Sequence, residues 1–453
     1  MKSAPLVSVV IAVYNGERFV ADAVASVRQQ QYQPIEVIVV DDASTDATVD
    51  IAASLPIDLL IVLPDNQGPS AARNIGMARA QGRYITFLDV DDLMLPGRVQ
   101  IQTDYLARNA DCSCVLTHQV LEVLPGITPP AWIHHHPETL DCPPYLPVSS
   151  MVSINALLEA GGFDPSYRLS EDMEWLFRLE RSGANVTKLD EVLVRRRIHG
   201  ANATYQTQQM NADLMRAVRA LTSRSHLPLV SVIVPVYNGA RYLAEALESI
   251  RAQTVDHLVQ VVVVDDGSTD ASASIAESFG SSVQVARQPH AGVGAARNHG
   301  VLLARARYLA FLDADDVWLP GKLAAQLAVL ETNPEVDAVL GQAEEFVSPE
   351  LGAGVATALR ARPAMPGHLT SAMLTRRSSF ARVGPFSIRR GAADWLDWYA
   401  RAVHQRLRFQ VLDDLVVRRR LHAANYSLRH QTARTGYAEI LKGAIDRQRG
   451  GTA

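Results

Sequence analysis

The strongest constraint on the fold of this chain is an internal repeat. The segment "PLVSVVIAVYNG", which begins at Pro5, returns as "PLVSVIVPVYNG" beginning at Pro228. Further matching segments follow in the same order along the 453 residues, with the offset changing by one residue between some of them. A long repeat of this kind indicates two homologous copies of one structural unit. The sequence therefore predicts two modules, residues 1–224 and 225–453.

Each module alternates short β-branched segments with helical segments. In the first module the strands are expected at residues 7–13, 36–41, 58–63 and 84–88, and the helices at 17–31, 46–54 and 69–81. This alternation is typical of an α/β fold with a mostly parallel, doubly wound sheet flanked by helices. In such sheets the ligand binds outside the carboxyl ends of the strands.

Polar residues follow the predicted strands at these ends. Tyr14 follows the first strand, Asp42 the second, and Asp89 and Asp91 the fourth. Carboxylates gathered at one edge repel each other by roughly 1 kcal/mol per close pair even in a wet site. A divalent cation such as Mg²⁺ or Mn²⁺ removes this repulsion and also binds substrate phosphates. The sequence thus favours a metal-dependent site for a nucleotide diphosphate, because helix capping explains only one carboxylate of "DVDD".

Five motifs of the first module resemble those of the family 2 glycosyltransferases, which have the GT-A fold: "SVVIAVYNG", "VIVVDDASTD", "AARNIG", "FLDVDD" and "SEDMEW". The similarity covers most of both modules. It implies an inverting transfer of a sugar from a nucleotide-sugar, usually linked to UDP, to a hydroxyl of a carbohydrate, lipid-linked or peptide acceptor. The processive synthases of this family carry a "QxxRW" element and membrane helices, so their absence from this sequence favours a nonprocessive enzyme.

The same resemblance implies roles for individual residues. The implied nucleotide-binding positions are Tyr14, Asp42, Arg73 and Asp89 in the first module and Tyr237, Asp266, Arg297 and Asp313 in the second. The implied metal ligands are Asp91 and Asp315, with His199 and His422 as additional contacts. Each histidine follows a run of three arginines, for which a solvated surface is the simpler interpretation. The implied catalytic base of the first module is Asp172, which a helix-capping role would also suit.

The two modules differ at the position of the base. When Gly161 is aligned with Gly384, Asp172 falls on Trp395 and the preceding glutamate falls on Asp394. A local shift of one residue would restore Asp394 as the base of the second module, and the sequence leaves both possibilities open. Without a base the second module would bind rather than catalyse. The alternatives are therefore a duplicated nucleotide-sugar-binding or scaffold protein with at most one active module, or a nucleotidyltransferase, which would not predict "SEDMEW".

The overall composition limits the partners and the location. The net charge of −5, with no basic tail, argues against a nucleic-acid partner. Three cysteines without framework spacing favour reduced thiols and the cytoplasm. No stretch reaches the roughly 20 apolar residues that span a bilayer, so the sequence predicts at most peripheral membrane contact. The "HHH" segment at 134–136 has no counterpart in the second module, and we interpret it as an acceptor-side loop.

Overall fold

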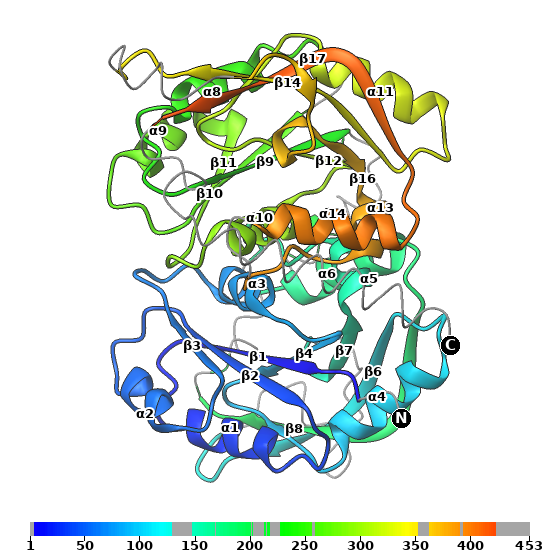
Figure 1. Cartoon of the computed structure of the whole chain (residues 1–453). Coiled ribbons are helices and arrows are strands. Elements are labelled where there is room, and N and C mark those ends of the chain that lie inside the picture. Colours follow the sequence, from blue (N-terminus) through cyan, green and yellow to red (C-terminus); the bar gives the residue numbers. More distant parts are fainter. Residues whose placement is uncertain are drawn as a thin grey trace. The chain divides into compact units, whose positions relative to one another are not determined.

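The computed structural model consists of two compact units, Met1–Ser225 and His226–Ala453, called module 1 and module 2 below (Figure 1). The residues it describes are 4–128, 147–167, 169–200, 202, 213, 215–217, 227–255, 259–351, 362–389 and 393–422. The "HHH" segment at 134–136 lies outside them. Among the described residues, no helix combines the length and the apolar character needed to cross a bilayer.

Module 1 is built on one eight-stranded sheet with the order β3-β2-β1-β4-β7-β6-β8-β5. The strands are β1 Val7–Val13, β2 Ile35–Asp41, β3 Leu59–Val62, β4 Tyr84–Asp89, β5 Leu93–Met94, β6 Cys114–Val123, β7 Ser150–Ser153 and β8 Val186–Ile198. The first four pair in parallel, which confirms the predicted doubly wound half. The other half is mixed, because β7 runs antiparallel to both β4 and β6, whereas β6 and β8 are parallel.

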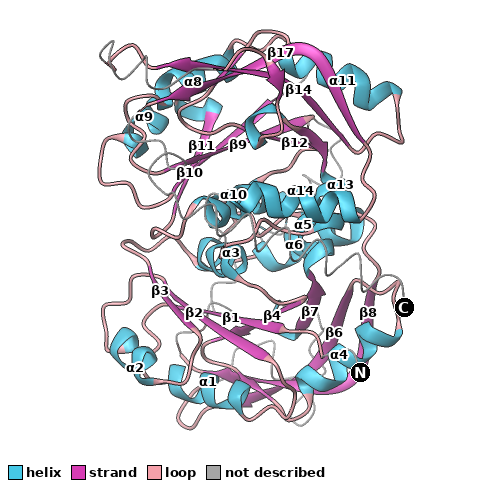
Figure 2. Cartoon of the chain, in the orientation of Figure 1, coloured by secondary structure: helices cyan, strands magenta, loops and turns pink. Residues whose placement is uncertain are grey.

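Helices cover both faces of this sheet (Figure 2). One face carries α1 Val20–Arg28, α2 Thr48–Ser54 and α4 Arg98–Arg108, and the other carries α3 Pro69–Arg79, α5 Ile154–Ala160 and α6 Glu171–Arg181. The glycine of "AARNIG" has a packing role: a Cβ on Gly76 would lie 2.5 Å from a methyl group of Val10. Only glycine lets α3 approach β1 so closely, and this holds the helix that carries Arg73 against the sheet.

Module 2 repeats the arrangement with the order β11-β10-β9-β12-β16-β14-β17-β13 and a short β15 beside β14. Its strands are β9 Val230–Val236, β10 Val259–Asp265, β11 Val283–Arg287, β12 Tyr308–Phe311, β13 Val317–Trp318, β14 Ala338–Val347, β15 Met365–Pro366, β16 Leu374–Arg376 and β17 Phe409–Leu421. Its helices are α8 Leu243–Arg251, α9 Ser272–Ser278, α10 Val293–Leu303, α11 Lys322–Thr332, α13 Arg377–Val383 and α14 Asp394–His404.

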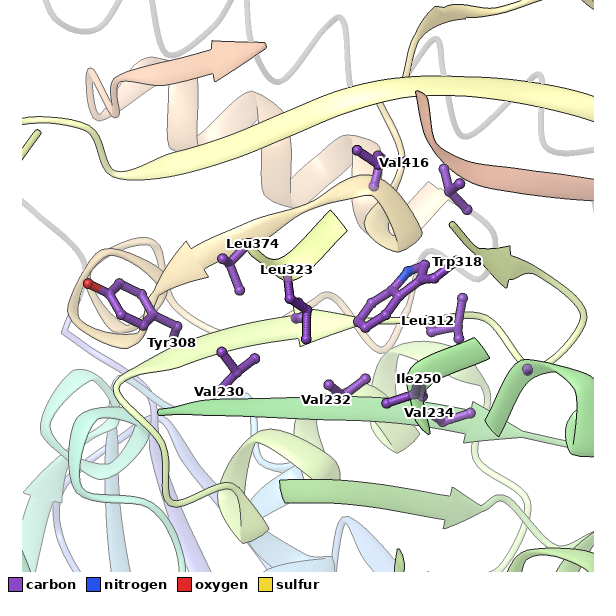
Figure 3. Close-up of a cluster of buried hydrophobic side chains, with 14 of the residues drawn as sticks. Val230, Val232, Val234, Ile250, Tyr308, Leu312, Trp318, Leu323, Leu374 and Val416 are labelled. Atoms are coloured by element: carbon purple, nitrogen blue, oxygen red, sulfur yellow. The ribbon is translucent and has the colours of Figure 1, made fainter. Parts of the chain in front are cut away.

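The largest hydrophobic cluster of each module lies between its sheet and one layer of helices. In module 2 the buried side chains of β9 pack against Ile250 of α8, Leu323 of α11 and Trp318 (Figure 3). The indole N–H of Trp318 has a hydrogen-bond partner in this apolar layer, because it donates to the Ser371 carbonyl at 2.7 Å. The core thus supports the short β13 segment that directly follows the "DADD" motif.

Candidate active site

A buried arginine ties together three elements at the carboxyl edge of the sheet in module 1. Arg73 of α3 lies 2.8 Å from Asp89 at the end of β4 and 2.9 Å from Glu171 at the start of α6. Burial by itself lowers the pKa of Arg73, but the two carboxylates more than offset this and raise it above its usual value. The guanidinium is therefore engaged with protein carboxylates, and Arg73 organises the site in addition to any contact with a nucleotide.

Module 2 contains the same arrangement with Asp394 in the position of Glu171. Arg297 of α10 lies 2.5 Å from Asp313 and 2.5 Å from Asp394. Burial raises the pKa of Asp394. No local shift separates the two helices, since α6 and α14 begin at Glu171 and Asp394 and each has 11 residues. The structure therefore gives Asp394 the arginine contact, rather than the position that Asp172 has in module 1.

Asp172 follows Glu171 in the first turn of α6 and is half-buried. Its Oδ1 accepts a hydrogen bond of 2.7 Å from the backbone N–H of Met173. Burial, followed by the charge of Glu171, raises the pKa of Asp172 to about 7. A carboxyl group that titrates near neutrality has the property expected of a general base working at physiological pH.

Trp395 stands at the corresponding position of module 2. Its indole N–H donates to the His368 carbonyl at 2.7 Å, and its ring stacks on Trp398 with the centroids 5.7 Å apart. An indole cannot accept a proton from a hydroxyl group. The two modules thus differ chemically at the second residue of two helices that have the same length.

The "DxD" aspartates meet the predicted histidines. In module 1 the Asp91 Oδ2 lies 3.0 Å from His199 Nε2 and accepts a hydrogen bond of 2.8 Å from Asn202. In module 2 the Asp315 Oδ2 lies 2.9 Å from His422 Nε2; Asn425, the counterpart of Asn202, lies outside the described residues.

These pairs fit a divalent cation that takes most of its ligands from a substrate. Among the described residues, no three Asp, Glu, His or Cys side chains form a complete metal site. Mg²⁺ and Mn²⁺, however, need only one or two protein ligands when a diphosphate supplies others. Neighbouring ligands of an octahedral ion with bonds of about 2.1 Å lie about 3 Å apart, as the carboxylate and imidazole do in both modules.

The arginine runs have mixed roles. Arg197 is buried: its backbone N–H donates to Asp92 at 3.1 Å, and its guanidinium lies 2.8 Å from Asp22. Burial, together with the charges of Asp91 and Asp89, raises the pKa of Asp92 well above its usual value. The last arginine of the run therefore has a structural role beside the "DxD" motif. The interpretation of the run as a solvated surface fits Arg195, which is exposed.

A second polar group lies where β2 meets the start of α3. Asp42 is buried, and its two carboxylate oxygens accept hydrogen bonds from the backbone N–H groups of Gln67 at 2.7 Å and Gly68 at 2.8 Å. Burial raises the pKa of Asp42. Asp42 thus shapes the loop that leads into α3, and Tyr14 stands half-exposed at the end of β1.

The sequence interpretation missed three residues in this region. In the part of the chain that the structure describes, Asp41 Oδ2, Gln67 Nε2 and Ser70 Oγ are buried without a hydrogen-bond partner. Buried polar atoms are normally paired, so each of these three atoms is a candidate contact for a ligand or a water molecule. The only signal in the sequence was the acidic pair "DD" after the second strand. Its first residue, Asp41, was given no role in the sequence analysis.

The match to a family model decides the family. The model described as "Glycosyl transferase family 2" matches residues 8–143 and 231–394. The chain belongs to this family. The resemblance seen in the five motifs is thereby confirmed, and the two matched segments fall in the two modules.

Relatives of this family 2 glycosyltransferase are themselves described as glycosyltransferases. It is 25% identical over 388 residues to an uncharacterized glycosyltransferase of Rickettsia felis, covering 73% of this chain and 64% of the relative. It is 31% identical over 202 residues to the putative teichuronic acid biosynthesis glycosyltransferase TuaG of Bacillus subtilis, covering 43% of this chain and 79% of the relative. The chain spans 56% of the length of a second relative, from Rickettsia bellii.

Parts of the chain are also similar to solved structures. S. aureus TarS 1-349 in complex with UDP-GlcNAc is 18% identical with a TM-score of 0.40, covering 48% of this chain and 67% of that one. The mannosyltransferase PcManGT from Pyrobaculum calidifontis, in complex with GDP-Man and Mn²⁺, is 22% identical with a TM-score of 0.38, covering 54% and 74%.

Proposed function

We propose that module 1 transfers a sugar from a UDP-linked donor to an acceptor hydroxyl with inversion at the anomeric carbon. The observation that carries this proposal is Asp172, a carboxyl group with a pKa of about 7, held next to the Arg73 network at the carboxyl edge of the sheet. The test is release of UDP from a panel of UDP-sugars, with and without Mn²⁺. No release with any of them would overturn the proposal.

Asp172 acts as the base in this reaction. Its ionised carboxylate accepts the proton of the acceptor hydroxyl as the oxygen forms a bond to the anomeric carbon and the bond to the diphosphate oxygen breaks. Attack from the side opposite to the diphosphate inverts the configuration of that carbon. Arg73 keeps Glu171, and therefore the start of α6, in position.

The DxD aspartate and its histidine would hold the metal. In module 1 these are Asp91 and His199, and in module 2 they are Asp315 and His422. When bound, Mg²⁺ or Mn²⁺ would stabilise the negative charge on the departing diphosphate. Buried Asp92 and Arg197 support Asp91 from behind, since the Arg197 guanidinium also donates to the Asp91 carbonyl.

The unpaired atoms beside α3 favour uridine as the nucleoside. A buried carboxylate oxygen of Asp41 needs a donor, whereas the Gln67 amide and the Ser70 hydroxyl can donate to acceptors. The imide edge of uracil offers one N–H between two carbonyl groups, which is complementary to this set. Adenine has no such edge.

Module 2 has a second candidate function, as a binding module. Its arginine, DxD and histidine contacts match those of module 1, but Trp395 replaces the base. It would therefore bind donor without rapid transfer, as a duplicated binding domain does. Consumption of two different donors by the chain would instead show two active modules.

The pH dependence of donor turnover should follow Asp172. The negative charge of Glu171 helps to raise the pKa of Asp172, and Glu171→Gln removes this charge. The pKa of Asp172 should therefore fall, although burial still raises it above its usual value. Because the base must be ionised, the rising limb near pH 7 should move to lower pH in the variant. Glu180→Gln, an exposed position on the same helix, serves as the control and should leave the limb in place. A shift to higher pH would contradict the assignment of the limb to Asp172.

Metal affinity should depend on the histidines. In His199→Gln the Mn²⁺ concentration that supports half-maximal UDP binding at module 1 should rise by about tenfold or more, because the ion loses a ligand. Calorimetry on the full chain measures it, with exposed His404→Gln as the control. UDP binding that is indifferent to EDTA would contradict the metal assignment.

A further inference from the structure

The two modules are built differently at the carboxylate that follows the second strand of each sheet. In module 1 the Asp42 carboxylate accepts two hydrogen bonds, both from backbone N–H groups. In module 2 the Asp266 carboxylate accepts the equivalent two, from Ala291 at 2.9 Å and Gly292 at 2.8 Å. The modules differ in the side chains that lie around this carboxylate.

One side chain of module 2 also donates to the Asp266 carboxylate. The Gln288 amide donates to Oδ1 at 2.7 Å, so this oxygen accepts two hydrogen bonds. The corresponding residue of module 1 is Pro64, which has no donor. His290 Nδ1 forms its hydrogen bond with the Asp266 backbone carbonyl at 3.1 Å, as the corresponding Asn66 of module 1 does with the Asp42 carbonyl.

A third residue fixes this arrangement. His299 is buried in α10, and burial lowers its pKa to about 4, so its ring is neutral. Its Nδ1 lies 2.9 Å from Gln288 Oε1, which assigns the N–H to Nδ1 and turns the Gln288 amide nitrogen toward Asp266. Module 1 has Ile75 at the position of His299. The chain from His299 through Gln288 to Asp266 is thus a feature of module 2.

Module 2 also lacks the unpaired donors of module 1. Ala291 replaces Gln67, and Gly294 replaces Ser70. No side chain fits at Gly294, because a Cβ there would lie 2.6 Å from the Ser387 carbonyl oxygen. The ring of His290 instead stacks on Tyr237, with the centroids 4.0 Å apart, and Tyr237 remains half-exposed.

We propose that the two modules select nucleotides differently: module 1 reads the hydrogen-bonding edge of the base, whereas module 2 binds nucleoside diphosphates without reading it. In module 2 the Tyr237–His290 stack offers a flat surface that any base can contact, and the Gln288 amide already occupies one oxygen of Asp266. Gln67 and Ser70 in module 1, against Gln288 and His290 in module 2, determine this specificity. This inference rests on the proposed function.

The experiment measures binding of UDP and ADP by calorimetry on the full chain with Mn²⁺. Asp315→Asn silences module 2 and Asp91→Asn silences module 1, so that each module is observed alone. Module 1 should bind UDP about tenfold more tightly than ADP, which corresponds to about one or two hydrogen bonds. Module 2 should discriminate by less than about threefold.

Two exchanges between the modules sharpen the test. Gln67→Ala gives module 1 the residue of module 2, and should weaken UDP binding while leaving ADP binding unchanged. His290→Asn gives module 2 the residue of module 1, and should weaken UDP and ADP binding by the same factor, since stacking does not read the base edge. Equal selectivity in both modules, or equal losses for both nucleotides in Gln67→Ala, would overturn this inference and leave the proposed function standing. Binding of neither nucleotide by the unmodified chain would overturn the proposed function itself.

Discussion

In the Asp172→Asn variant, sugar transfer by the full chain falls by about 10²–10⁴-fold, the usual contribution of a general base. The amide cannot accept the proton of the acceptor hydroxyl, and module 2 cannot replace the base, because Trp395 occupies the equivalent position. Binding of UDP should change little, since Asp91 and Arg73 are untouched. The measurement is the rate of UDP release together with the dissociation constant for UDP.

Asp394→Asn is the matched variant for this prediction. It alters the first residue of α14 in module 2, where Asp394 is the partner of Arg297. We expect it to lower the stability of module 2 and to leave most of the transfer activity. Loss of all transfer in a variant that remains folded would assign the base to Asp394 and contradict the single-base account.

Arg73→Met should lower the free energy of unfolding of module 1 by about 3–5 kcal/mol, the usual effect of removing one partner from a buried ion pair. The guanidinium is buried, and its removal leaves Glu171 in a poorly solvated position without a counter-charge. Urea unfolding followed by tryptophan fluorescence measures the change. The same substitution at Arg297 should act equally on module 2.

Arg28→Met provides the control for the arginine experiment. Arg28 lies 2.7 Å from Asp58, but both side chains are partly exposed, at 26% and 47%. An exposed pair of this kind contributes about 0–1 kcal/mol. If Arg73→Met cost no more than Arg28→Met and acted only on UDP affinity, Arg73 would be a nucleotide contact rather than the organiser of the site.

The parallel half of each sheet could be predicted from the sequence because its central strands are buried on both faces. Such strands are nearly continuous runs of valine and isoleucine, as in Ile35–Asp41, so their bounds differ by at most about one residue from those expected. The mixed half was not predictable in the same way. β8 and β17 contain long polar stretches, and their pairing with β6 and β14 depends on contacts between distant segments.

The predicted site residues gather at the strand ends, but their partners could not be read from the sequence. Aligning Gly161 with Gly384 placed Trp395 opposite Asp172, and both helices keep that register in the structure. The contact of Arg73 with Glu171 joins residues 98 positions apart, and no local pattern encodes it. The unpaired oxygen of Asp41 and the chain from His299 to Asp266 depend likewise on side-chain orientation.

Direct displacement with Asp172 as the base is the central claim, and the configuration of the product tests it most directly. The chain is supplied with a UDP-sugar in the α configuration, Mn²⁺ and water or an acceptor alcohol, and the anomeric proton of the first product formed is observed by NMR. The mechanism predicts a β product, formed at least about 10²-fold more slowly in the Asp172→Asn variant. An α product would require a covalent intermediate or attack from the side of the departing diphosphate, and would contradict the role of Asp172 as a base.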